Sequence, residues 1–206
     1  MPKKSKKIIA VIILIVCVAI VYTIKAVIGP SVMGFSTQVD GKTKGYKNAP
    51  VKITEFIDFQ CPACAVGAKY LEEQIQSYPE LIRLQIKHYP LEMHIHGLLS
   101  AQYAECANQQ EKFWSFHDLL FSRQSNWARL VNAKQAFDQI AHEVGLNVDN
   151  LSACLQDKKI TEIIARNKTE GAARGVRSTP SYFVNGKLIV GKQSLELEIQ
   201  KYLEKN

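Results

Sequence analysis

Two cysteines spaced Cys-x-x-Cys, Cys61 and Cys64, are the residues of this chain best suited to chemistry. An apolar run rich in β-branched residues, Val51 to Phe59, precedes them and a helical pattern follows through about Ser77, so a strand delivers Cys61 to the first turn of a helix. The unpaired N–H groups and dipole at a helix N-terminus favour a thiolate, and lower a cysteine pKa from ~8.5 to ~3.5–7.5. Pro62 suits the first helical position. We therefore predict dithiol–disulfide exchange, with Cys61 as the exposed nucleophile and Cys64 as the more buried resolving thiol.

A zinc half-site and a purely structural disulfide are the competing interpretations of this motif. A structural zinc ion needs four ligands, usually from two such pairs, and the sequence contains no second Cys-x-x-Cys. The strand before the motif, the proline within it and the helix after it favour redox chemistry.

The N-terminal residues 1–28 have the pattern of a membrane anchor. A cluster of lysines precedes an apolar run from Ile8 to Ile24, and counting through Ile28 gives a stretch long enough to span a bilayer. The region lacks the small-residue cleavage site of a secretory signal, so an uncleaved signal-anchor is favoured over a cleaved signal peptide. The lysine cluster should stay in the cytoplasm, which places the rest of the chain on the extracytoplasmic face of a single-pass membrane protein.

Glycines, prolines and polar residues dominate residues 29–49, which reads as a flexible linker, and residues 50–206 remain as one domain. The net charge of +7 is largely a property of the anchor. Five of the 26 basic residues and none of the 19 acidic ones lie in residues 1–28, so the remainder carries only +2. No Gly-rich phosphate loop or basic–aromatic alternation is present, and nucleic acid is not an expected partner.

The pattern of the domain predicts an α/β fold. A second strand, Leu81 to Tyr89, follows the helix after Cys64 and completes a right-handed βαβ unit. Residues from about 91 to 174 carry helical periodicity. Asn185-Gly186 then marks a tight turn between two apolar strands, and a closing helix follows the second of these strands.

Two carboxylates near the motif are candidates for a buried proton-exchanging group. Glu55 lies within the apolar strand, where an unpaired carboxylate is costly to bury, and Asp58 lies just after it. Spacing alone does not separate the two.

Cys106 and Cys154 both fall in the helical region. Two cysteines in one compact unit of an exported protein are expected to pair, and the long loop between them would give a large entropic stabilisation. A second shuttling pair is the alternative. Met93-His94-x-His96 offers copper-type ligands, but a third ligand would be needed from elsewhere, and a polar helix entry is the simpler interpretation.

Taken together, these motifs closely resemble the DsbA-like thiol-disulfide oxidoreductases of bacteria, a thioredoxin-fold family. The resemblance runs from Asn48 to the C-terminus, and its most specific stretches are Ala49-Pro50-Val51 through Cys61-Pro62-Ala63-Cys64, Glu105-Cys106-Ala107 with Lys112-Phe113-Trp114, and Gly175-Val176-Arg177-Ser178-Thr179-Pro180. It implies a thioredoxin fold with a helical insertion, here preceded by the predicted transmembrane helix.

The resemblance also implies roles for individual residues. Cys61 would be the attacking thiolate and Cys64 its resolving partner. Thr179-Pro180 would form the cis-proline loop that contacts substrate, and Cys106–Cys154 would be a structural disulfide. The buried acid of thioredoxin-like proteins lies six residues before the first cysteine, which selects Glu55. The dipeptide Pro62-Ala63 lacks the histidine of strongly oxidising members, which implies a less oxidising potential.

The function implied is that of a monomeric, membrane-tethered disulfide oxidase acting on reduced exported proteins, without cofactor or metal. A membrane quinone-linked partner of the DsbB or vitamin K epoxide reductase-like kind would reoxidise it. The alternatives are a reductase or isomerase of the same fold, and a copper-handling module that uses Cys61, Cys64 and a histidine.

Overall fold

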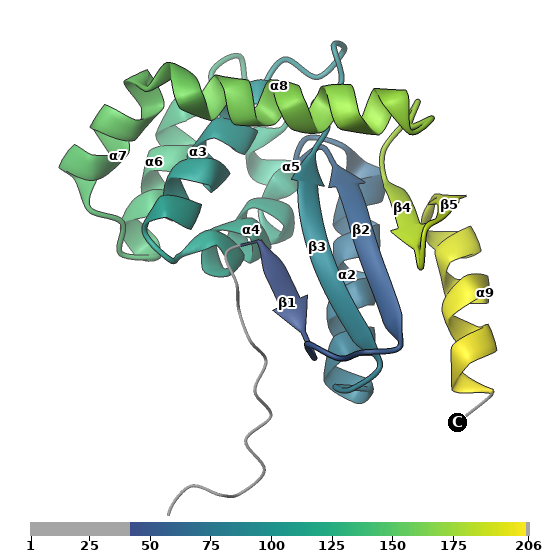
Figure 1. Cartoon of the computed structure of the whole chain (residues 1–206). Helices are drawn as coiled ribbons and strands as arrows, with labels where there is room; N and C mark the ends of the chain where they lie inside the picture. Colours follow the sequence, from purple (N-terminus) through teal and green to yellow (C-terminus); the bar gives the residue numbers. More distant parts are fainter. Residues whose placement is uncertain (1–41, 205–206) are drawn as a thin grey trace, which may run out of the picture. The chain divides into compact units, whose positions relative to one another are not determined.

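The computed structural model describes residues 42–204 and shows a sheet flanked by helices (Figure 1). The strands are β1 (Thr43–Gly45), β2 (Val51–Ile57), β3 (Ile82–His88), β4 (Ser181–Val184) and β5 (Lys187–Val190). The helices are α2 (Pro62–Ser77), α3 (Gly97–Gln109), α4 (Phe113–Ser122), α5 (Gln124–Trp127), α6 (Lys134–Glu143), α7 (Val148–Gln156), α8 (Lys158–Ala173) and α9 (Lys192–Leu203). The strand–helix–strand unit, the helical region and the final hairpin and helix are thus all where the sequence patterns predict them.

The sheet has the strand order β1-β3-β2-β4-β5. Strands β2 and β3 are parallel, as a βαβ crossover requires, and the other pairs are antiparallel. The central strand β2 carries apolar side chains on both faces, because both faces are covered by helices. Asn185 and Gly186 have the positive φ values of 47° and 87° that the predicted hairpin turn needs.

The first strand corrects the predicted linker. Thr43–Gly45 lies within residues 29–49, yet it pairs with β3 as an edge strand. Lys42, the residue before β1, forms an ion pair with the buried carboxylate of Glu105 on α3. The same carboxylate lies 3.0 Å from Nε2 of His88. Burial opposes ionisation of Glu105, but the hydrogen bond and charge of His88 together with Lys42 lower its pKa to about 2. The strand β1 could not be predicted from the sequence, because three residues are too few to show a period-2 pattern.

The predicted membrane segment, residues 1–28, lies outside the described residues, as does the first part of the predicted linker. Within residues 42–204, no helix is both long and apolar enough to cross a bilayer.

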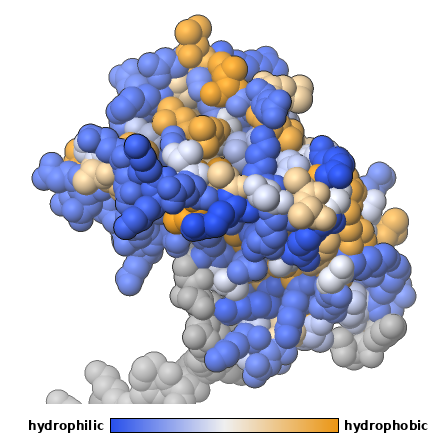
Figure 2. Space-filling view, turned by 45° about the horizontal axis from the view of Figure 1, so that its top comes forward, coloured by the Kyte–Doolittle hydropathy of each residue, from blue (hydrophilic) through white to orange (hydrophobic). Residues whose placement is uncertain are grey.

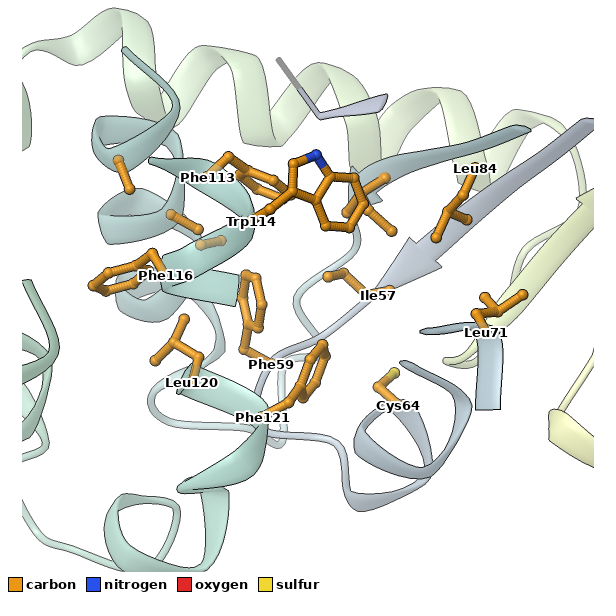
Figure 3. Close-up of a cluster of buried hydrophobic side chains, with 14 of the residues drawn as sticks. Ile57, Phe59, Cys64, Leu71, Leu84, Phe113, Trp114, Phe116, Leu120 and Phe121 are labelled. Carbon is orange, nitrogen blue, oxygen red and sulfur yellow. The ribbon is translucent and has the colours of Figure 1, made fainter. Parts of the chain in front are cut away.

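Two hydrophobic clusters hold the sheet to its helices. The smaller one lies on the side of α8, where Phe56 packs edge-on against Tyr89 and Phe183. The larger one joins β2 and β3 to α2 and to the aromatic face of α4 (Figure 3). Within it the ring centroid of Phe59 lies 4.9 Å from that of Phe121, and Cys64 lies between Phe121 and Leu71 in the view of Figure 3. Each large side chain buried there contributes roughly 1.5–3 kcal/mol to folding.

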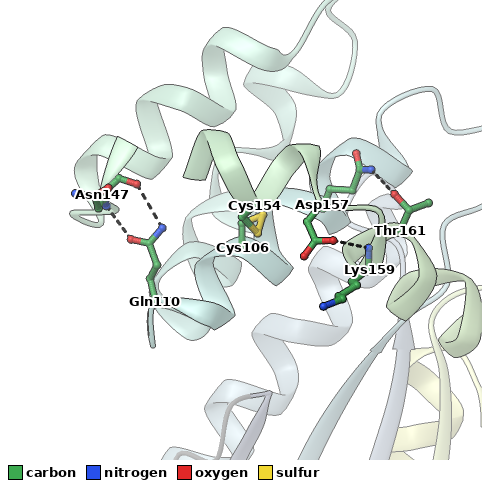
Figure 4. The surroundings of a disulfide bond; sticks show 8 residues. Cys106, Gln110, Asn147, Cys154, Asp157, Lys159 and Thr161 are labelled. Carbon is green, nitrogen blue, oxygen red and sulfur yellow. Dashed lines mark hydrogen bonds between the residues drawn. A yellow bond between two sulfur atoms is a disulfide. The ribbon is translucent and has the colours of Figure 1, made fainter. Parts of the chain in front are cut away.

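The predicted disulfide is present in the helical region. Cys106 of α3 and Cys154 of α7 are joined across 48 positions of sequence, and beside them Gln110 and Asn147 exchange hydrogen bonds (Figure 4). The bond therefore fixes α7 to α3 within the helical insertion.

Replacing both Cys106 and Cys154 with alanine should lower the free energy of unfolding by about 4 kcal/mol, because the unfolded chain regains the entropy of a loop of about 49 residues. Denaturant unfolding of the oxidised protein measures this. Mass spectrometry after thiol alkylation provides the control: the bond should persist in a glutathione buffer that reduces Cys61–Cys64. A loss below about 1 kcal/mol, or reduction of both pairs together, would contradict a structural role.

Candidate active site

The turn between β2 and α2 positions Cys61. The Cys61 N–H donates to the carbonyl of Asp58 at 3.0 Å, and Cys61 has the extended conformation of an N-cap residue, with φ −74° and ψ 118°. Pro62 occupies the first turn, as predicted, and the N–H of Cys64 donates to the Cys61 carbonyl at 3.1 Å. The sulfur of Cys61 is thus held where the helix presents its unpaired N–H groups.

The Cys61 thiol is strongly acidified. The pKa of Cys61 is lowered to about 5, and the largest cause is a hydrogen bond from the Cys64 thiol. Burial acts in the opposite direction and raises the pKa. Hydrogen bonds from Thr179 and from the N–H groups of Cys64 and Ala63 lower it further. In its protonated form the thiol donates to the Thr179 carbonyl at 3.4 Å. Cys61 is 7% exposed, less open than the sequence predicts, although Cys64 is fully buried at 0%.

Cys64 has the opposite character. Burial, followed by the hydrogen bond and charge of Cys61 and the charge of Glu55, raises its pKa well above the usual value. The two cysteines are unbonded in this structure, which therefore represents the reduced state. One sulfur is a thiolate at neutral pH and its neighbour is a thiol, which is the arrangement that dithiol–disulfide exchange needs.

The structure separates the two candidate acids. Glu55 is completely buried, and burial raises its pKa to about 8 although the nearby Tyr182 hydroxyl opposes the shift. Asp58 is nearly as buried, but its carboxylate accepts from the N–H of Gln60 at 2.8 Å, from the N–H of Leu91 at 2.7 Å and lies 2.7 Å from Nδ1 of His94. Glu55 is thus a buried acid with a raised pKa and few polar neighbours, whereas Asp58 is held by contacts within and beside the active-site turn.

The Thr179-Pro180 peptide bond is cis, and the Thr179 carbonyl lies against Cys61. The chain therefore brings together residues 118 positions apart in sequence, as the resemblance implies.

Two glutamines outside the sequence motifs also hold this turn. The amide of Gln124 donates to the carbonyls of Phe59 at 2.7 Å and Cys61 at 2.9 Å. Gln60 donates to the carbonyl of Ala128 at 2.8 Å and accepts from the N–H of His96 at 2.6 Å. No short-range pattern marks either residue, because their partners come from distant loops.

The Met93-His94-x-His96 segment does not converge on a common point. His94 pairs with Asp58, Nε2 of His96 lies 2.7 Å from the Leu130 carbonyl, and Met93 is exposed. Across residues 42–204 no group of three or more His, Cys, Asp or Glu side chains is arranged to hold a metal ion.

The loops that contact Gln60, together with the first turn of α3, expose several large apolar side chains: Met93, Ile95, Leu98, Leu130 and Val131. Figure 2, in which the top of Figure 1 comes forward, shows apolar patches on this face among mainly hydrophilic residues.

A family model described as thioredoxin matches residues 37–205. This chain belongs to the DsbA-like thiol-disulfide oxidoreductases of the thioredoxin family. It is 29% identical to a probable disulfide bond formation protein D of Bacillus anthracis, with 98% of this chain and all of that protein covered.

Crystal structures show the same fold. BdbD from Bacillus subtilis superposes with a TM-score of 0.67 at 21% identity, covering 81% of this chain and 95% of that one. A thioredoxin-like oxidoreductase from Silicibacter pomeroyi gives 0.65 at 25% identity, covering 80% and 92%.

Other relatives are longer. The chain is 30% identical to the Na(+)/H(+) antiporter NhaA 3 of Salinispora tropica over 74% of its own length, but it spans only 23% of that protein.

Titration of the reduced protein, followed by the ultraviolet absorbance of the thiolate, should show a midpoint near pH 5 that Cys61→Ser removes. Because the folded pKa lies below that of an unfolded cysteine, ionisation stabilises the reduced protein fully above pH ~8.5 and the benefit is lost as the pH falls through about 5.

The matched variants Cys64→Ala and Cys64→Ser test the leading cause of this acidity. Alanine removes the hydrogen-bond donor and should raise the midpoint, whereas serine retains a donor and should keep it low. A midpoint near that of a free cysteine in the unmodified protein would remove the basis for exchange chemistry at Cys61.

Proposed function

We propose that this protein is an extracytoplasmic disulfide oxidase that transfers the Cys61–Cys64 disulfide to exported proteins. The observation that carries the proposal is the low pKa of Cys61, about 5. A stabilised thiolate is a good leaving group, and it favours the reduced enzyme over its disulfide, which makes that disulfide a stronger oxidant.

The reaction proceeds in two displacements. A substrate thiolate attacks Sγ of Cys61, the Cys61–Cys64 bond breaks, and Cys64 leaves with the electron pair of that bond. The neutral Glu55 carboxyl supplies a proton to the Cys64 sulfur. A second substrate thiolate then attacks the substrate sulfur of the mixed disulfide and releases Cys61 as a thiolate. Two electrons have passed to the enzyme, and the substrate holds a new disulfide.

Thr179 and Pro180 are proposed to contact the substrate around its cysteine. The Thr179 carbonyl, 3.4 Å from the Cys61 sulfur, lies where the substrate backbone must approach. The exposed apolar side chains beside Gln60 are proposed to bind an unfolded substrate, because unfolded chains expose apolar side chains that folded proteins bury.

The lysine cluster and apolar run of residues 1–28 are proposed to anchor the protein in the cell membrane, with the domain on the extracytoplasmic side. A quinone-linked membrane protein of the DsbB or vitamin K epoxide reductase-like kind would then accept the two electrons and restore the Cys61–Cys64 disulfide.

The oxidised protein should restore activity to reduced ribonuclease in a glutathione buffer, and Cys61→Ser should abolish this. Cys64→Ser should accumulate mixed disulfides at Cys61, because the resolving thiol is gone; mass spectrometry of the trapped species also identifies substrates and the redox partner. Wild-type activity in Cys61→Ser would overturn the assignment.

Equilibration with glutathione decides the direction of the reaction. A potential towards about −120 mV supports an oxidase, whereas one near about −270 mV supports a reductase of the same fold. The Pro62-Ala63 dipeptide makes a value between these limits the specific expectation.

Anchoring predicts that the full chain stays with carbonate-washed membranes and that protease added from outside degrades the domain. Intact-mass measurement should find residues 1–28 retained. A soluble product that lacks them would show instead that the segment is a cleaved signal peptide.

A further inference from the structure

The buried acid Glu55 has a specific neighbour from the opposite strand. Glu55 of β2 and Tyr182 of β4 are directly paired in the antiparallel register, so their side chains project from the same face of the sheet. Both residues are 0% exposed. Neither carboxylate oxygen of Glu55 nor the Tyr182 hydroxyl has a geometrically well-formed hydrogen bond within residues 42–204, although the hydroxyl is near enough to oppose the rise in the pKa of Glu55. Buried polar atoms are normally satisfied, so this pair needs an explanation.

Helix α2 leaves room for the hydroxyl at one position. Gly67 is buried against the sheet, and a methyl group added there would overlap Oη of Tyr182 while lying only 3.7 Å from Oε1 of Glu55. Glycine in a helix interior is otherwise less favourable than alanine. The missing side chain at Gly67 therefore makes space for the tyrosine oxygen beside the carboxylate.

The same position lies close to the reacting sulfurs. Gly67 follows Cys64 by three residues, which places both on one face of α2. Ile57, which shares the strand face of Glu55, lies in one cluster with Cys64 and Leu71 of α2 (Figure 3).

The surroundings of Glu55 are otherwise apolar. Among the described residues, three titratable groups interact electrostatically within this pocket besides Glu55. Cys61 and Cys64 come from the start of α2, and Tyr182 comes from β4. From β3 the residue opposite Glu55 is the apolar Ile86.

We propose that Tyr182 is a positioning residue whose hydroxyl, housed over Gly67, donates a hydrogen bond to the Glu55 carboxylate after Glu55 has given its proton to Cys64. The inference rests on the proposed role of Glu55 as proton donor in the exchange reaction. The step balances: the proton moves from the Glu55 carboxyl to the Cys64 thiolate, and the charge left on Glu55 is held by the tyrosine hydroxyl. When Cys64 is deprotonated again during reoxidation, the same hydrogen bond is released.

The hydroxyl has a defined electrostatic consequence. A hydrogen bond to the charged form of an acid lowers its pKa, which opposes the rise caused by burial. With the hydroxyl present, Glu55 can exchange a proton with Cys64 near neutral pH. Without the hydroxyl, the Glu55 carboxyl should hold its proton too tightly to give it to Cys64 in each catalytic cycle.

Tyr182→Phe is the decisive variant, because it removes one oxygen and preserves the ring. The test is a carbon-13 NMR titration of the Glu55 carboxyl in the oxidised protein, where neither Cys61 nor Cys64 titrates, with Glu55→Gln to assign the signal. The midpoint should lie near pH 8 in the unmodified protein. Tyr182→Phe should move it upward by about one pH unit.

Tyr103→Phe is the matched control. Its hydroxyl is also partly enclosed but donates to Asp138 at 2.6 Å, so its removal should leave the Glu55 midpoint unchanged. An unchanged midpoint in Tyr182→Phe, or an equal shift in Tyr103→Phe, would overturn the proposal. The titration needs no enzymatic turnover, so this failure is distinct from failure of the oxidase assignment, which the ribonuclease assay reports.

A second pair of variants tests the placement of the hydroxyl. Gly67→Ala should lower the urea midpoint of the unmodified protein by about 1 M, because the new methyl group collides with Tyr182 Oη. In the Tyr182→Phe background the nearest ring atom is Cζ at 3.5 Å, an ordinary contact, so the same substitution should be neutral or stabilising. Equal losses in both backgrounds would show that Gly67 does not house the hydroxyl.

Discussion

The chemistry of this protein depends on the hydrogen bond between two sulfurs at the start of one helix. The Cys64 thiol donates to the Cys61 sulfur, and this contact lowers the pKa of one cysteine while it raises that of the other. Burial makes the contact effective, because a charge that water reaches poorly gains more from each donor. The surrounding residues keep this geometry, and in the proposed reaction Glu55 supplies the proton that Cys64 gains.

The helical insertion contributes more than a cover for the sheet. Aromatic residues of α4 pack around Phe59, two residues before Cys61, and help to bury Cys64 (Figure 3). The short helix α5 contributes Gln124, which binds the carbonyls of Phe59 and Cys61. Movement of the insertion would therefore change both the burial of Cys64 and the orientation of Cys61. The disulfide between α3 and α7 limits such movement within the insertion itself.

Most of the secondary structure could be predicted from patterns that extend over only a few residues. The periodicity around the Cys-x-x-Cys motif, the proline within it and the Asn185-Gly186 turn each act over a few residues, and the elements that they predict are present. The short strand β1, the two glutamines on the active-site turn and the Glu105 ion pairs depend on partners far away in sequence, so no local pattern revealed them. The limited exposure of Cys61 was missed for the same reason, since loops distant in sequence enclose it.

The choice between Glu55 and Asp58 shows why position near a cysteine does not by itself define an acid's role. Both carboxylates are buried within a few residues of Cys61. Asp58 accepts from two backbone N–H groups and contacts the ring of His94, whereas within residues 42–204 the one polar side chain that acts on Glu55 is the Tyr182 hydroxyl. The Asp58 carboxylate is therefore already hydrogen-bonded within the active-site turn and to the segment that begins at Leu91. A carboxyl whose burial favours the neutral form can give its proton when a thiolate appears beside it, and take it back when that thiolate is oxidised. Proton exchange at this site therefore requires a pocket that offers the Glu55 carboxylate few hydrogen-bond donors. In our proposal Tyr182 is such a donor, and its hydroxyl sets how far the pKa of Glu55 rises.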